Sequence, residues 1–237
     1  MEIGDECYPA RLRDLPRPPK RLWWHGDLDL LNRVVVAVVG TRRATPYGRR
    51  MTTEIAGALA RAGATVVSGM ALGIDAAAHR AALDATGTTV AVLGTGADIA
   101  YPRGHVALHA EIATRGAVLS ELPPGSHSNR GSFPERNRII AALATATIVV
   151  EAPFDSGALI TADRATELGR DVGVVPGPID SPQSQGSNAL MRDGAHPIVA
   201  VADALTLVGL APPGVPSAPR LETDSEIRIW RALDDGG

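Results

Sequence analysis

The run VVVAVVG, residues 34–40, consists of β-branched and small apolar residues and ends in glycine. A strand of this composition has no polar face, which is typical of a strand buried on both sides of a sheet. Five similar short runs follow along the chain: TVVSG (65–69), TVAVLG (89–94), AVLSEL (117–122), TIVVEA (147–152) and VGVVPG (172–177). Helical patterns separate successive runs, so the sequence predicts repeated βαβ units.

We therefore expect an α/β protein with a Rossmann-like fold, in which a mostly parallel sheet of about six strands carries helices on both faces. A last strand and helix are predicted in residues 196–210. Ligands of such sheets bind at the carboxyl ends of the strands, near the point where the strand order reverses. Four of the predicted strands end in glycine at that edge: Gly40, Gly69, Gly94 and Gly177.

Both ends of the chain differ in composition from this main domain, which we place at residues 34–210. Residues 1–33 are rich in proline and arginine, and we expect them to form an N-terminal extension that packs on the core. Residues 211–221 have the composition of a proline-rich linker. Residues 222–237 resemble one amphipathic helix, which is too short to fold alone, and are interpreted as the start of a truncated second domain.

The composition fits one main globular domain, since 237 residues with 45% hydrophobic content can bury a full core. No apolar run approaches the roughly 20 residues of a membrane span and the N-terminus lacks a signal-peptide pattern, so we expect a cytoplasmic protein without a membrane partner. The single cysteine, Cys7, excludes an intrachain disulfide, and the histidines are scattered, so no metal site is expected. With a net charge of −3, any nucleic-acid binding must rest on a local basic patch.

Two common nucleotide-binding motifs are absent from the sequence. GTGADI, residues 94–99, has Ile99 where a G-x-G-x-x-G motif needs its third glycine. The only lysine, Lys20, lies outside any P-loop pattern. No cofactor is therefore expected, and because no G-x-S-x-G motif or nucleophile-base pair stands out, neither is an enzymatic activity.

The loop after the first predicted strand, GTRRATPYG, is rich in arginine. Backbone amides at a strand-to-helix turn bind anions, and beside Gly40 and Thr41 the side chains of Arg42 and Arg43 would add bidentate phosphate donors. Anion binding and plain solvated surface charge are both compatible with this pattern.

The loop after the second predicted strand has a similar design. Ser68 and Gly69 allow a ligand to approach the backbone closely. Asp75 is interpreted as an N-cap of the next helix, and His79 as a surface or helix-packing histidine.

A helix is predicted to begin near Ser132 in the stretch GSFPERNRIIAAL, because Ser132 and Glu135 have the spacing of a capping box. At about 100° per residue, Arg136 and Arg138 would project from nearly opposite sides of this helix. One is expected to face the strand-end cleft and the other to bind a second phosphate or a structural carboxylate, such as Glu121 or Glu151.

A further strand-to-helix junction lies in EAPFDSGALITA. Ser156 is predicted to be the N-cap and Gly157 to begin the helix. The pair would form another anion-binding helix terminus, although ordinary capping explains it equally well.

Several long motifs, in order, resemble those of the DNA-processing protein A family, also called DprA or Smf: GTRRATPYG, SGMALGIDAAAH, GTGADIAYP, FPERNRIIAAL, VVEAPFDSGALITA, VVPG and GSNALMRDGA. The resemblance covers about residues 8–205. It implies an extended Rossmann fold that binds single-stranded DNA without sequence preference, protects it in natural transformation and helps to load the RecA recombinase. It also implies a homodimer and no enzymatic activity.

The resemblance assigns phosphate binding to two short motifs, whose residues here are Gly40, Thr41 and Arg42, and Arg136, Asn137 and Arg138. One motif departs from the family, since His105 stands where Y-P-x-x-N has asparagine. Aromatic residues make up only 3% of the chain, so backbone electrostatics should dominate DNA binding, with few rings for stacking beyond Tyr47, Tyr101 and Phe133.

Two other functions remain open at this point. The first is a nucleotide phosphoribohydrolase-like enzyme, although VPGPIDSPQSQG lacks the P-G-G-x-G-T-x-x-E motif of those enzymes. The second is a sensor that binds a small nucleotide in the same cleft.

Overall fold

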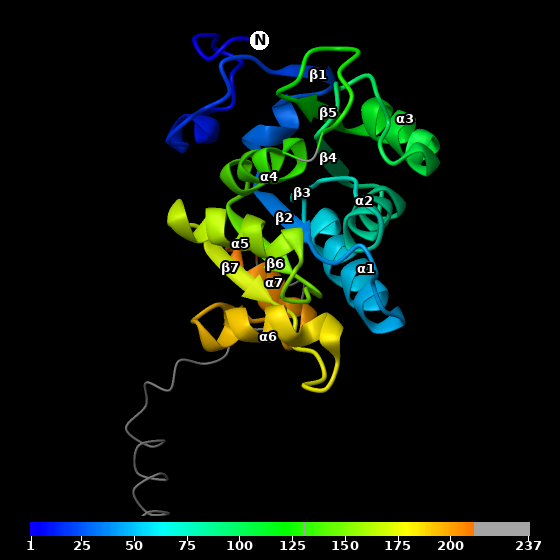
Figure 1. Ribbon diagram of the computed structural model, residues 1–237, viewed down its shortest axis with the longest axis vertical. Helices are drawn as coiled ribbons and strands as arrows, with labels where there is room; N and C mark the ends of the chain where they lie inside the picture. Colours follow the sequence, from blue (N-terminus) through cyan, green and yellow to red (C-terminus); the bar gives the residue numbers. More distant parts are fainter. Residues whose placement is uncertain (130, 211–237) are drawn as a thin grey trace, which may run out of the picture.

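A computed structural model describes residues 1–129 and 131–210 (Figure 1). The predicted linker and truncated second domain, residues 211–221 and 222–237, lie outside the described residues. Eight strands form one sheet in the order β1-β5-β4-β3-β2-β6-β7-β8. All neighbours are parallel except β1 and β5. The strands are β1 (Trp23–Gly26), β2 (Val35–Val39), β3 (Thr65–Ser68), β4 (Thr88–Leu93), β5 (Ala117–Ser120), β6 (Ala146–Val149), β7 (Asp171–Val174) and β8 (His196–Pro197).

The sheet is buried on both faces, as the continuous apolar runs predict. In β2, Val35, Ala37 and Val39 belong to one hydrophobic cluster, and Val36 and Val38 belong to another. Helices α1, α2, α3 and α7 supply the second face, and α4, α5 and α6 supply the first. The helices are α1 (Pro46–Arg61), α2 (Ile74–Asp84), α3 (Val106–Arg115), α4 (Ser132–Leu143), α5 (Gly157–Glu167), α6 (Gln185–Arg192) and α7 (Val201–Leu207).

The predicted α/β fold is confirmed: all six internal strands form, and β8 and α7 lie within the predicted 196–210 segment. Strand β1 was not predicted. It pairs antiparallel with β5 at the edge of the sheet. Three of its four residues are exposed, so this strand does not need the apolar run by which the others were recognised. The N-terminal segment also buries Tyr8, Leu12 and Leu15 in the cluster that contains α4 and α5.

The strand order reverses between β2 and β6, at the centre of the sheet. The helix after β2, α1, packs on one face of the sheet, and the helix after β6, α5, packs on the other, as Figure 1 shows. The loops that leave these two strands therefore separate at their carboxyl ends, which opens a crevice there. Among the described residues, no helix is both long and apolar enough to cross a membrane.

Candidate nucleic-acid interface

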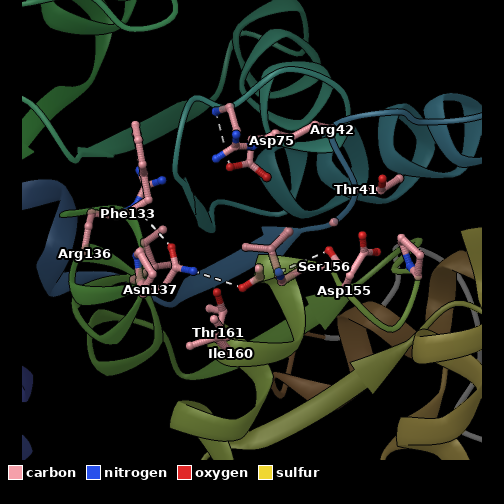
Figure 2. A pocket seen from close by; sticks show the side chains of 18 of the residues that line it. Thr41, Arg42, Asp75, Phe133, Arg136, Asn137, Asp155, Ser156, Ile160 and Thr161 are labelled. Atoms are coloured by element: carbon pink, nitrogen blue, oxygen red, sulfur yellow. Dashed lines mark hydrogen bonds between the residues drawn. The ribbon is translucent and has the colours of Figure 1, made fainter. Parts of the chain in front are cut away.

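A cleft of about 900 Å³ lies at this reversal point (Figure 2). Its walls come from the loops after β2, β3, β4 and β6, from the residues just before α4, from the first turns of α2, α4 and α5, and from Gln183 before α6. The cleft brings together most of the predicted site residues: Gly40, Thr41, Arg42, Arg43, Arg136, Asn137, Ser156 and Gly157. Gly69 lines a small adjoining pocket of about 60 Å³, which shares Arg42, Phe133 and Arg136 with the main cleft.

The loop after β2 is held so that its two arginines point into solvent. The amide of Thr41 donates to the carbonyl of Glu151 at 2.7 Å, and the Thr41 hydroxyl accepts from the amide of Arg43 at 3.2 Å. Thr41 is buried, whereas Arg42 and Arg43 are exposed. Neither arginine forms an ion pair with a residue of the described ranges 1–129 and 131–210. Both guanidinium groups are therefore available for phosphate.

An aromatic platform lies beside these arginines. The guanidinium of Arg42 lies over the ring of Phe133, 5.4 Å from its centroid. The ring of Tyr101 packs against the same phenylalanine at 5.2 Å and an angle of 38°. Tyr101 is 42% exposed and Phe133 is half-buried. We define Arg42, Tyr101 and Phe133 as the stacking platform, because such a group can stack an unpaired nucleobase next to a phosphate contact.

Arg136 contributes to the cleft differently from the expectation. Its side chain is buried, and Nη1 donates to the carbonyls of Gly69, at 2.6 Å, and of Val92. Burial lowers the pKa of Arg136 to about 10, so the group stays charged at neutral pH. Through these contacts, much of the guanidinium holds the ends of β3 and β4 to α4.

The prediction that Asp75 caps α2 is wrong. The N-cap of α2 is Gly73, without a side-chain cap, and Asp75 lies in the first turn. Asp75 Oδ2 accepts from the amides of Gly69, at 3.1 Å, and Ala71, at 3.4 Å. Burial raises the pKa of this carboxyl, and the charge of Arg136 opposes that rise. Asp75 and Arg136 thus fix the same loop from two sides.

Three helix N-termini at this edge are already satisfied by the chain itself. Glu151 accepts from the amide of Thr45, the N-cap of α1, at 2.9 Å, and its carboxylate fills the space beside Gly48. The expected anion site at the start of α1 is therefore occupied by a buried carboxylate. At α2, the amide of Ile74 donates instead to the backbone carbonyl of Thr41 at 3.2 Å.

At α4 the predicted capping box is also wrong. Asn129 Oδ1 accepts from the amides of Gly131 and Ser132, while Glu135 pairs instead with Arg138. The helix nevertheless begins at Ser132 as predicted.

The first turn of α5 is capped by a neutral side chain. Ser156 is its N-cap, as predicted, and accepts from the amide of Ala158 at 3.3 Å. No carboxylate of the described ranges is hydrogen-bonded to this turn. Asn137 reaches across the cleft and donates to the carbonyl of Gly157 at 3.0 Å (dashed line in Figure 2), which joins α4 to α5.

Comparison with known proteins identifies the origin of this arrangement. The sequence pattern of the family described as DNA recombination-mediator protein A matches residues 1–209. The chain belongs to this family.

Two relatives in the family are Protein Smf of Synechocystis sp. and DNA processing protein DprA of Streptococcus pneumoniae. The chain is 45% identical to the first over 212 residues, which are 88% of this chain and 53% of the relative. It is 43% identical to the second over 205 residues, 86% of this chain and 72% of the relative. The chain spans about half the length of several curated relatives that it matches.

Solved structures of the family share the fold. The DprA structure from Streptococcus pneumoniae superposes with a TM-score of 0.84 and 42% identity, covering 87% of this chain and 72% of that one. The DprA of Helicobacter pylori, whose structure describes a single-stranded DNA binding mode, superposes with a TM-score of 0.79 and 35% identity, covering 84% and 92%. A molybdenum cofactor binding protein from Rippkaea orientalis, at 15% identity and a TM-score of 0.54, shares the fold alone.

Besides Gly69, two predicted site residues do not line the cleft. Ser68 is fully buried and donates to the carbonyl of Val38 at 2.7 Å, inside the sheet. Arg138 projects away from the cleft, and its Nη2 donates to both carboxylate oxygens of Glu121 at 2.7 and 2.5 Å. The opposed directions of Arg136 and Arg138 and the pairing with Glu121 are as expected, whereas Glu151 is not an arginine partner.

Sequence reasoning missed several polar residues that line the cleft of this family member, among them Asp155 and Gln183. Asp155 immediately precedes the N-cap Ser156, so its neighbourhood was visible in the sequence. Gln183 carries no sequence signal, because folding brings it to Thr41 from 142 residues away, with 3.4 Å between the Thr41 hydroxyl and Gln183 Oε1. Within residues 1–129 and 131–210, no group of His, Cys, Asp or Glu side chains is placed to hold a metal ion.

Proposed function

We propose that this chain binds single-stranded DNA without sequence preference in the cleft between β2 and β6. The observation that carries the proposal is the stacking platform beside two unpaired arginines, at the reversal point of the sheet. Arg42 and Arg43 would hold phosphates, and Phe133 and Tyr101 would take the face of a base. The single-stranded DNA binding mode of the Helicobacter pylori relative supports the same ligand.

The preference for single strands follows from what the platform needs. Duplex DNA hides the faces of its bases in the stack, so it offers Phe133 only phosphates and base edges. An unpaired strand can place a base on the ring and keep its phosphates beside Arg42. Stacking does not depend on which base is present, which fits binding without sequence preference.

We further propose that the protein acts in the cytoplasm as a homodimer, protects incoming DNA during natural transformation and helps to load the RecA recombinase. Membership of the family supports this role. The role involves no catalysis in the proposal. Light scattering tests the dimer, and RecA assembly on coated single strands tests the loading step.

The direct test is fluorescence anisotropy of labelled oligothymidine and of a matched duplex, each titrated across a series of salt concentrations. We expect tighter binding of the single strand, and log K that falls with log salt by about 0.7 for each phosphate neutralised. An affinity that does not change with salt, or equal binding of duplex, would contradict the proposal. Incubation with adenosine monophosphate, followed by a search for released adenine, tests the enzymatic alternative.

A further inference from the structure

Both phenylalanines of the chain, Phe133 and Phe154, lie at the carboxyl edge of the sheet. Neither belongs to the hydrophobic core, although phenylalanine is one of the residues most often buried. Phe133 forms part of the stacking platform. Phe154 is 66% exposed and makes no aromatic or cation–π contact with the described residues.

Phe154 lies beside the cleft without lining it, between two residues that do. It lies in a tight turn that the amide of Ser156 closes by donating to the carbonyl of Pro153 at 3.0 Å. Pro153 and Asp155, its neighbours in this turn, both line the cleft. The turn is fixed at each end, because Ser156 caps α5 and the carbonyl of Ala152 accepts from Ser187 at 3.0 Å. The ring of Phe154 is therefore exposed to solvent, and the backbone that carries it is held in place by hydrogen bonds.

Charge divides the cleft into two sides. Arg42 and Arg43 lie on the loop after β2, and Asp155 lies on the loop after β6. The two arginines attract a phosphate more strongly than the second loop does, where the carboxylate of Asp155 opposes the attraction of the α5 N-terminus. A strand that crosses the cleft would therefore keep its phosphates near β2 and turn bases toward the lip that carries Phe154.

We propose that Phe154 is a second base-stacking residue, which receives a base of the same DNA strand that contacts the stacking platform. This inference rests on the proposed function. The strand would run along the carboxyl edge from Tyr101, after β4, past β3 and β2 to Phe154, after β6. Three strand spacings make this distance about 14 Å, so one nucleotide cannot reach both rings. The contact is thus made only by an oligonucleotide of sufficient length.

The test compares Phe154→Ala, Phe154→Leu and Phe154→Trp with the wild type on oligothymidines of increasing length. On long oligomers we expect Phe154→Ala and Phe154→Leu to bind about tenfold more weakly and Phe154→Trp to bind as the wild type does, because only the ring supports stacking. On the shortest oligomers that still bind, all four should be equal. The salt dependence should not change, because no phosphate contact is lost.

Ile179→Ala serves as the matched control, since Ile179 is 91% exposed on the next loop and lies outside the predicted path. It should bind like the wild type. If Phe154→Ala or Phe154→Leu keeps full affinity at every length while Arg42→Ala loses it, the second stacking site is refuted and the cleft proposal stands. If the wild type binds no single strand, both are refuted. Fluorescence of Phe154→Trp, corrected for the wild-type signal, should be quenched by long oligomers, and an unchanged spectrum would also refute the contact.

Discussion

The guanidinium of Arg136 lies so close to Gly69 that a β-carbon on this glycine would fall 2.5 Å from Arg136 Cζ. The arginine is enclosed there by the carbonyls of Gly69 and Val92 and by the charge of Asp75. The glycine at the end of β3 therefore makes room for a buried arginine. This packing explains its presence without any need for a ligand at that point.

Gly69→Ala should destabilise the fold by about 1–3 kcal/mol, because the enclosed guanidinium cannot move without breaking its hydrogen bonds. Urea denaturation measures the loss. Gly104→Ala is the control, since a β-carbon added to Gly104 would meet no atom within 4 Å. Equal stability of the two variants would mean that Arg136 can shift at little cost.

Arg42→Ala should weaken single-stranded DNA binding and reduce the salt slope by about 0.7, with no loss of folding stability. The reason is that Arg42 is exposed and, among the described residues, its guanidinium makes no hydrogen bond or ion pair and lies over the ring of Phe133. Anisotropy across a salt series and a thermal melt give the two readouts. Arg49→Ala, an exposed arginine of α1 outside the cleft, should bind as the wild type does. An unchanged slope for Arg42→Ala would remove this residue from the DNA contacts.

Arg138→Ala should show the opposite pattern. Its side chain is 13% exposed and pairs with Glu121 through both carboxylate oxygens, so the variant should lose about 1–3 kcal/mol of stability. The salt slope of DNA binding should stay that of the wild type. A double-mutant cycle with Glu121→Ala isolates the pair. A reduced slope in the folded Arg138→Ala protein would return Arg138 to the phosphate contacts.

Folding stability should depend on pH through His79. Its Nδ1 lies 2.7 Å from the hydroxyl of Thr89, which itself donates to the carbonyl of Val66, so Nδ1 carries the proton and the buried Nε2 has none. Burial, and then the positive charge of Arg136 and the nearby His105, lower the pKa of His79 to about 3. In the unfolded chain the pKa is about 6.5.

Below about pH 6.5, His79 is therefore protonated in the unfolded chain but stays neutral in the folded protein. The contribution of neutral His79 to the free energy of unfolding is fully present above this pH. It is lost, at about 1.4 kcal/mol per pH unit, as the pH falls toward 3. Urea denaturation between about pH 7 and about pH 5 should show a smaller loss for His79→Gln than for the wild type. The exposed His127, changed to glutamine, should leave the wild-type dependence intact. Identical slopes for His79→Gln and the wild type would show that His79 titrates normally.

The sequence carries most of the fold because a strand buried on both faces needs an unbroken apolar run. This is why β2 could be found from residues 34–40 alone, and why the largely exposed β1 could not. The positions of Arg42 and Arg43 were also predictable, since a loop between a strand and a helix is a local feature. For the arginines of α4, only the side of the helix was predictable. Helical geometry places Arg136 and Arg138 on nearly opposite sides, but it does not determine which groups they contact.

Those partners come from distant parts of the chain. Arg136 donates to the carbonyls of Gly69, directly after β3, and of Val92 in β4, which lie 67 and 44 residues earlier. Whether Asp75 or Glu151 caps a helix, binds an arginine or fills a helix N-terminus depends likewise on how loops meet after folding. From the sequence, the role of each carboxylate was predicted from its residue type and its distance along the chain from the next helix. These two features do not distinguish a helix cap from an arginine partner.

The buried carboxylate of Glu151 gives the first helix of the core a counter-ion of its own. In dinucleotide-binding folds the pyrophosphate sits at that helix terminus. A free nucleotide entering this cleft would have to displace Glu151 to reach the same position. We therefore expect the cellular pool of mononucleotides to compete poorly with DNA, which can reach Arg42 and Arg43 without using that terminus and can add contacts along its length.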